Sequence, residues 1–154
     1  MIEHSTSDVS IIRCADYDRE RTFSVVKQAV DLLGGIQTFV KPGERVLIKP
    51  NLLKGKAPEA AVTTHPEIVR AVIRLVRDAG GEPMVGDSPG MGDLRKVCEK
   101  AGILDVVNEE GATLVELDEV VQVRNQGRFQ RFEIARADTK RMRSSIFRSS
   151  RPTA

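Results

Sequence analysis

Alternating apolar and polar runs predict strands and helices that follow one another along the chain. A β-branched run at 9–15 and a continuous apolar run at 45–49 have the composition of strands. Between them, apolar positions spaced three and four apart over residues 21–33 predict an amphipathic helix, which the Gly-Gly pair at 34–35 ends. This order, strand then helix then strand, is typical of an α/β protein.

The segment 63–87 predicts a second helix and strand. Thr64 and Glu67 have the capping-box spacing, and Pro66 suits a first helical turn because its missing N–H costs nothing there. We therefore expect a helix that begins with Thr64 as its N-cap and ends near residue 80. The short apolar run at 83–87 follows as a strand.

The remaining pattern completes the predicted fold. The expected elements are a third helix capped by Asp93 and stopped at Gly102, a turn at 103–107, a strand at 112–116, and a hairpin of the runs 119–123 and 128–134. Together they predict an α/β fold with a doubly wound, mainly parallel sheet, helices on both faces and a β-hairpin near the C-terminus. The sheet is expected to be incomplete, and its open edge favours self-association.

Composition narrows the functional classes. The 154 residues are 40% hydrophobic and 30% charged, which fits one globular domain at 1–137 followed by a basic tail at 138–154. That tail holds five basic residues and one acid. With no Trp, one Tyr and five Phe, the folded part lacks the pattern of a nucleic-acid-binding protein. We find no membrane-spanning run or signal peptide, so we expect a cytoplasmic protein with no membrane partner.

Candidate binding residues cluster after two predicted strands and at one helix start. In an open parallel sheet, loops at the carboxyl ends of strands converge on one crevice, and a helix N-terminus attracts anions. The set could therefore surround a carboxylate or phosphate, although each residue also has an ordinary role in a turn or cap. The candidates are Lys49, Asn51, Thr64, His65, Asp87 and Ser88.

Other chemistries fit the sequence poorly. The string at 86–90 matches G-x-S-x-G, but Pro89 lacks the N–H that the residue after a nucleophilic serine must donate. The same segment lacks the Lys-Ser or Lys-Thr of a phosphate loop and the third glycine of a dinucleotide fingerprint. No histidine has a second candidate ligand near it, so we expect no metal site. Cys14 and Cys98 are expected to be free thiols, and two cysteines are too few for a cubane iron–sulfur cluster.

Three segments resemble a bacterial and archaeal family known as domain of unknown function 362. They are V-L-I-K-P-N-L at 46–52, T-T-H-P-E-I-V at 63–69 and V-G-D-S-P-G at 85–90, and the resemblance covers about residues 9–136. Members of this family are usually about twice this length or more, and many carry ferredoxin-like cysteine motifs. The resemblance thus implies the N-terminal part of a redox-linked iron–sulfur protein, with the 4Fe–4S cluster in longer members only. It supplies no catalytic residues.

The tail departs from the family pattern after Arg136. The family continues with a strand and a basic Pro-Lys-Leu-Lys-Thr-His segment, whereas 140–154 has no apolar period and predicts no element. One possible coding sequence for this tail, read in a shifted frame, gives that strand and motif. We therefore expect a truncated, out-of-frame tail and no independent activity. The alternative is a non-catalytic binding or interaction module, in which a disordered basic tail binds an acidic partner.

Overall fold

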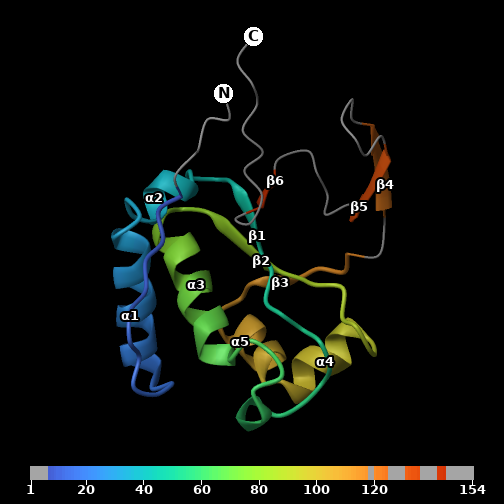
Figure 1. The fold of residues 1–154 in the computed structure, drawn as a ribbon, viewed down its shortest axis with the longest axis horizontal. Helices are drawn as coiled ribbons and strands as arrows, with labels where there is room; N and C mark the ends of the chain where they lie inside the picture. The colour runs from blue at the N-terminus through green and yellow to red at the C-terminus, as the bar shows by residue number, and fades with distance from the viewer. Residues whose placement is uncertain (1–6, 118–119, 125–130, 136–141, 145–154) are drawn as a thin grey trace.

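The computed structural model describes residues 7–117, 120–124, 131–135 and 142–144 (Figure 1). Helices and strands alternate through most of this part, as the sequence pattern predicts. The helical elements are α1 (Arg19–Asp31), α2 (Ile36–Phe39), a 3-10 turn (Pro58–Ala60), α3 (Pro66–Asp78), α4 (Leu94–Lys100) and α5 (Ile103–Glu109). The strands are β1 (Arg45–Ile48), β2 (Glu82–Val85), β3 (Thr113–Leu114), β4 (Val120–Arg124), β5 (Arg131–Ala135) and β6 (Met142–Ser144).

Four of these strands form a parallel sheet in the order β3-β2-β1-β6. In the register, Leu47 lies beside Met84 of β2 on one side and beside Ser144 of β6 on the other. The chain thus moves outward from β1 to β3 and later returns to the opposite side of β1. The predicted α/β class and the mainly parallel sheet are confirmed.

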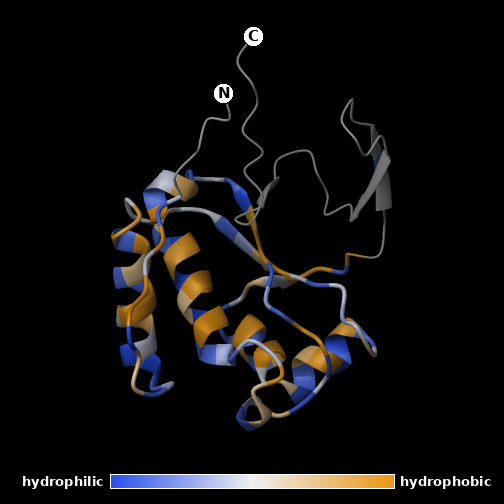
Figure 2. Cartoon of the chain, viewed as in Figure 1, coloured by the Kyte–Doolittle hydropathy of each residue, from blue (hydrophilic) through white to orange (hydrophobic). Residues whose placement is uncertain are grey.

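The core lies between the sheet and α3, with α4 and α5 closing its lower end (Figure 1). Val46 and Ile48 of β1 point into it, and Val69 and Ile73 supply the facing side of α3. Figure 2 shows that apolar residues make up most of the visible part of α3. Both crossovers run in the same direction across the sheet, so right-handed connections place α3 and α5 on one face.

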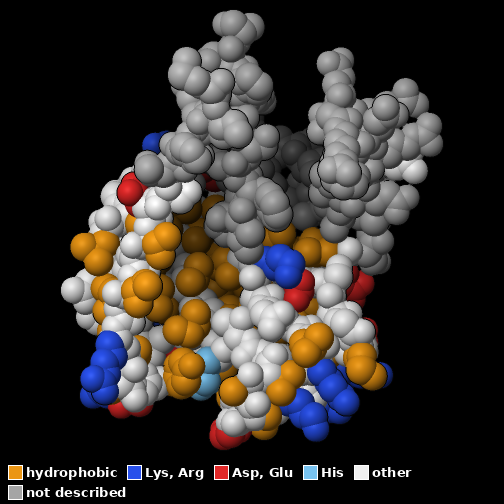
Figure 3. Space-filling view, in the orientation of Figure 1, with side chains coloured by type: hydrophobic (Ala, Val, Ile, Leu, Met, Phe, Trp, Pro, Cys, Tyr) orange, Lys and Arg blue, Asp and Glu red, His pale blue; other side chains and the backbone are white. Residues whose placement is uncertain are grey.

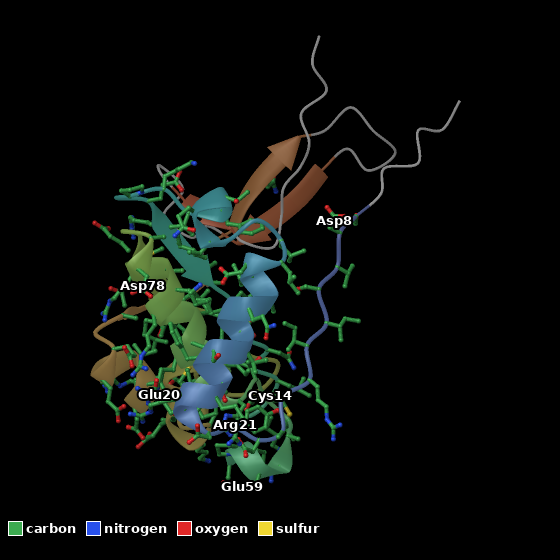
Figure 4. The ribbon with its side chains drawn as sticks, turned by 90° about the vertical axis from the view of Figure 1, so that its left-hand side faces the viewer. Asp8, Cys14, Glu20, Arg21, Glu59 and Asp78 are labelled. Carbon is green, nitrogen blue, oxygen red and sulfur yellow. The ribbon has the colours of Figure 1, made fainter. Side chains whose placement is uncertain are left out.

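The predicted strand at 9–15 is wrong. This segment is extended but pairs with no described strand, and it runs alongside α1, as Figure 4 shows between Asp8 and Cys14. The Ser10 hydroxyl donates to the Ala29 carbonyl of α1 at 2.8 Å. The run predicted as an edge-near strand therefore lies along a helix, and its Ile11 is 90% exposed.

Two helix boundaries also differ from the prediction. The N-cap of α3 is His65 rather than Thr64, because the imidazole Nδ1 accepts the Glu67 N–H at 3.2 Å. Asp18, which the pattern does not single out, caps α1 through the N–H of Arg21. The residues expected to form a turn after Gly102 instead make the two-turn helix α5.

Near the C-terminus, β4 and β5 pair antiparallel, Val120 beside Ala135. The residues that would join them as a hairpin, 125–130, lie outside the described residues, as does most of the tail. Within the stretch 140–154, for which the sequence predicts no element, the short strand β6 pairs parallel with β1. Among the described residues, no helix is long and apolar enough to span a bilayer.

Candidate functional site

The carboxyl end of β1 is the point where the strand order reverses. β2 lies on one side of β1 and β6 on the other, and ligands of open α/β sheets bind at such a reversal. Two loops leave the sheet at this edge, one after β1 and one after β2. We call them the strand-end loops, residues 49–57 and 86–93. An isolated bridge between Lys54 and Met91 joins them.

Asp87 fastens the two strand-end loops together. The residue is 6% exposed, and its Oδ2 accepts the backbone N–H of Leu52 at 2.9 Å. Its Oδ1 lies 2.5 Å from the Lys49 ammonium. A buried carboxylate requires such partners, because burial without them costs several kcal/mol. Both oxygens are therefore engaged within the protein, which makes Asp87 a residue that positions the loop and the lysine.

Lys49 is held by this carboxylate but remains open to solvent. Its side chain is 46% exposed, and Asp87 is its one ion-pair partner in the described part of the chain. An ammonium has three N–H donors, so two remain for another acceptor. Lys49 thus presents a positively charged group at the carboxyl end of β1, held in place by Asp87.

Asn51 and Thr64 are joined by two hydrogen bonds. The Asn51 N–H donates to the Thr64 hydroxyl at 2.8 Å, and the Thr64 N–H donates to the Asn51 carbonyl at 3.0 Å. These bonds use the backbone of Asn51 and leave its carboxamide without a hydrogen bond to any described residue. Thr64 therefore orients the loop and does not cap its helix.

His65 is committed to its own helix and to a stacking contact. Its ring stacks on Tyr17 with centroids 3.7 Å apart and planes 6° from parallel. Because Nδ1 accepts the Glu67 N–H, the ring is neutral, and burial lowers its pKa although the charges of Glu67 and Glu59 act to raise it. Pro66 has no N–H, and the Ile68 N–H donates to the His65 carbonyl. The first turn of α3 therefore offers no free backbone donor to an anion.

Ser88 lies in the second strand-end loop and contacts the segment that follows β3. Its hydroxyl donates to the Leu117 carbonyl at 3.1 Å. The preceding Gly86 lies so close to the next strand that a Cβ there would stand 2.5 Å from the Val115 carbonyl oxygen. This close approach explains the glycine, and it fixes the direction in which the loop leaves β2.

The structure gives pairwise contacts for the six predicted residues. Lys49 meets Asp87, Asn51 meets Thr64, and His65 and Ser88 contact residues outside the set. A neighbour that the prediction missed is Cys98 of α4, which is fully buried. Burial and the charge of Asp87 raise the pKa of its thiol to about 11. No local signal in the sequence places this thiol near the strand-end loops.

A second charged group joins three helices and was not predicted. Arg70 is 4% exposed, and its guanidinium contacts Glu67 at 3.1 Å, Glu109 at 2.7 Å and Glu110 at 2.9 Å. Burial acts to lower the pKa of Arg70, but the hydrogen bonds to the three glutamates outweigh it and raise the pKa. We call this group the arginine–glutamate cluster, which consists of Arg19, Arg70, Arg74, Arg77, Glu20, Glu67, Glu109 and Glu110.

The residues of this chain do not fit an iron–sulfur cluster. A cubane cluster takes four cysteine ligands, and the sequence has two. Cys14 is exposed beside α1, whereas Cys98 is buried in α4. Within the described ranges, no three His, Cys, Asp or Glu side chains come together as a metal site would require.

Comparison with known proteins gives one family and one curated relative. The family model described as domain of unknown function (DUF362) matches residues 46–140. A protein of Synechocystis sp. that is named a thylakoid-associated protein is 43% identical over 108 residues, which are 70% of this chain and 34% of the relative. The chain therefore spans about a third of the length of that relative. No solved structure matches.

Proposed function

Because the chain belongs to the family described as domain of unknown function 362, we propose that it is the N-terminal, small-molecule-binding part of a longer redox-linked iron–sulfur protein. Its ligand would be an anion that carries a carboxylate or phosphate group. The observation that carries the ligand proposal is the ammonium of Lys49, fixed 2.5 Å from Asp87 where the strand order reverses. The redox and iron–sulfur part rests on the family resemblance.

The proposed contacts use two residues of the first strand-end loop. Lys49 has two N–H donors left for an anion, and the exposed Asn51 carboxamide adds an uncharged donor two residues along. Asp87 holds this ammonium in place through the 2.5 Å ion pair. The ligand would thus displace solvent around Lys49 without displacing Asp87 from the Leu52 N–H.

In this proposal the chain binds and the rest of the longer protein performs the redox chemistry. A 4Fe–4S cluster would be held by cysteines of the remaining two thirds of such a protein, because this chain has only two. The free thiols fit the reducing cytoplasm, which we propose as the location. We expect no independent turnover from this chain.

Binding of inorganic phosphate and of succinate, measured by calorimetry and by the shift of Tm, tests the proposal. A ligand at a hundredfold excess over its Kd stabilises the folded state by about 2.7 kcal/mol. We expect Lys49→Ala to abolish this stabilisation and Lys49→Arg to retain most of it, because the positive charge is kept. The melting of each variant without anion reports whether it still folds.

Lys27→Ala is the matched control. Lys27 on α1 also lies 2.5 Å from a carboxylate, that of Asp31, and its side chain is 51% exposed. If Lys27→Ala reduces the anion effect as much as Lys49→Ala does, the stabilisation is a general surface effect and the site is wrong. If neither anion stabilises the native chain, a non-catalytic interaction module becomes the better account.

A further inference from the structure

Lysines and exposed apolar side chains occur together on the strand-end loops and α4. Leu53 is 57% exposed and Met91 is 62% exposed, although both are large and apolar. The bridge between Lys54 and Met91 and the contact that a Gly90 Cβ would make with Leu53 at 3.2 Å place these two residues side by side. Gly55 lies against Lys100 of α4, with 3.1 Å from its ideal Cβ to the Lys100 Cδ.

Four lysines of the first strand-end loop and α4 have no carboxylate partner among the described residues. Lys54 and Lys56 flank Gly55, and Lys96 and Lys100 are four residues apart and so share one side of α4. Within the ranges that the structure describes, none of the four makes an ion pair, whereas Lys27 and Lys49 each do. The loop 49–57 contains three lysines and no acid. Figure 3 shows basic and apolar side chains side by side over this lower right part of the molecule.

This combination differs from an ordinary solvated surface. Unpaired lysines alone would attract any polyanion. Exposure of apolar side chains to water is unfavourable, and their transfer into a lipid interface is favourable. The lysine stems can lie along the acyl boundary while their ammonium groups reach the lipid phosphates. The exposed apolar residues lie on two neighbouring loops, which suits a planar bilayer better than a narrow acidic peptide.

We propose that the surface formed by Leu53, Met91, Lys54, Lys56, Lys96 and Lys100 docks this protein onto a bilayer that contains anionic lipids. This contact is peripheral. It differs from the expectation of no membrane partner, which rests only on the lack of a membrane-spanning run or signal peptide. It is independent of the proposed anion site, because Lys49 and Asn51 are not part of this surface. In the docked protein, the carboxyl end of β1 would lie close to the lipid headgroups.

Flotation of the full chain with vesicles tests this surface. One set of vesicles is phosphatidylcholine alone, and the other contains equal parts of phosphatidylcholine and phosphatidylglycerol. We expect binding to the anionic vesicles only, weakened by salt. Each lysine near such a surface contributes about a fivefold change in affinity, so Lys54→Ala with Lys56→Ala should lower it roughly 25-fold. Leu53→Ser should lower it about tenfold through lost apolar burial.

Matched variants separate this surface from the basic tail and from total charge. Lys27→Ala with Lys41→Ala removes the same charge elsewhere on the protein. Leu32→Ser replaces an apolar residue at the C-cap of α1 whose side chain is similarly exposed, at 67%. Both should bind as the native chain does. Equal losses in test and control variants would assign the binding to net charge or to the tail and overturn the proposal. Equal binding to both vesicle types would also overturn the proposal. So would full competition by polyglutamate, if Leu53→Ser then has no effect on vesicle binding.

Discussion

The arginine–glutamate cluster and the strand-end loops both hold a buried charge, but they satisfy it differently. Arg70 is enclosed by three glutamates, and its partners are in turn contacted by other arginines. Asp87 is equally buried, yet its cation Lys49 extends to the surface with donors to spare. A charge cluster that closes on itself stabilises the helices, whereas one that ends in an exposed cation can bind something else.

The largest expected effect comes from opening the closed cluster. Arg70→Met leaves Glu67 and Glu110, which are 16% and 11% exposed, without their buried cation. We expect the free energy of unfolding to fall by about 3 kcal/mol, as for other buried pairs that lose one partner. Urea unfolding measures this loss.

Arg77→Met is the control for that variant. Arg77 is 41% exposed and reaches Glu110 only at 3.9 Å, so its removal should cost less than about 1 kcal/mol. Similar losses in the two variants would mean that enclosure of Arg70 does not distinguish it from a surface arginine.

The next effect concerns the buried half of the strand-end pair. Asp87→Ala removes the acceptor of the Leu52 N–H as well as the partner of Lys49, and we expect a loss of about 2 kcal/mol. Asp87→Asn keeps an oxygen for that N–H and should lose about half as much. Thermal and urea unfolding of both variants measure the difference. If Asn is as harmful as Ala, the charge matters more than the hydrogen bond.

A smaller effect is expected from the neutral cap of α3. Because the pKa of His65 is lowered in the folded state, unfolded chains take up the proton first as the pH falls below about 6.5. The stability contributed by the neutral ring is thus complete above that pH and is lost as the pH falls toward the folded pKa. His65→Asn retains a capping side chain that does not titrate, and a cap contributes roughly 1 kcal/mol. Unfolding curves between pH 7 and pH 5 should diverge, and parallel curves would refute this role.

The smallest effect on stability is expected at Cys14, which is exposed. Cys14→Ser should leave unfolding unchanged but remove the thiol that a disulfide reagent reaches in the folded protein. Cys98 should react only after unfolding, because it is buried and its thiol has a pKa of about 11. Counting modified thiols before and after adding urea checks both statements. Rapid reaction of Cys98 in the native state would show that α4 opens readily.

The sequence predicts those parts of the fold that depend on local pattern. The apolar period of α3 and the continuous run of β1 appear almost where expected. Lys49 and Asp87 also come together as predicted, because carboxyl ends of neighbouring parallel strands meet at one edge. The β-branched run at 9–15 was predicted as a strand, but a strand needs a partner, and local pattern contains no information about whether one exists.

Other features depend on distant contacts that the local pattern does not specify. Thr64 and His65 are both reasonable caps before Pro66, and the choice is made by Asn51, whose N–H engages the Thr64 hydroxyl. Arg70 is an ordinary helical arginine until α5 brings Glu109 and Glu110 beside it. The separation of 40 residues between Arg70 and Glu110 exceeds any helical spacing that a sequence pattern could reveal.

This separation has a consequence for synthesis on the ribosome. Arg70 leaves the exit tunnel well before Glu110. During that interval its guanidinium can pair with Glu67 but not with the glutamates at the end of α5. We expect nascent chains arrested before α5 to remain protease-sensitive around α3, and chains that include α5 to become protected. The order of translation would therefore delay the docking of α3 until the last helix of the described chain has emerged.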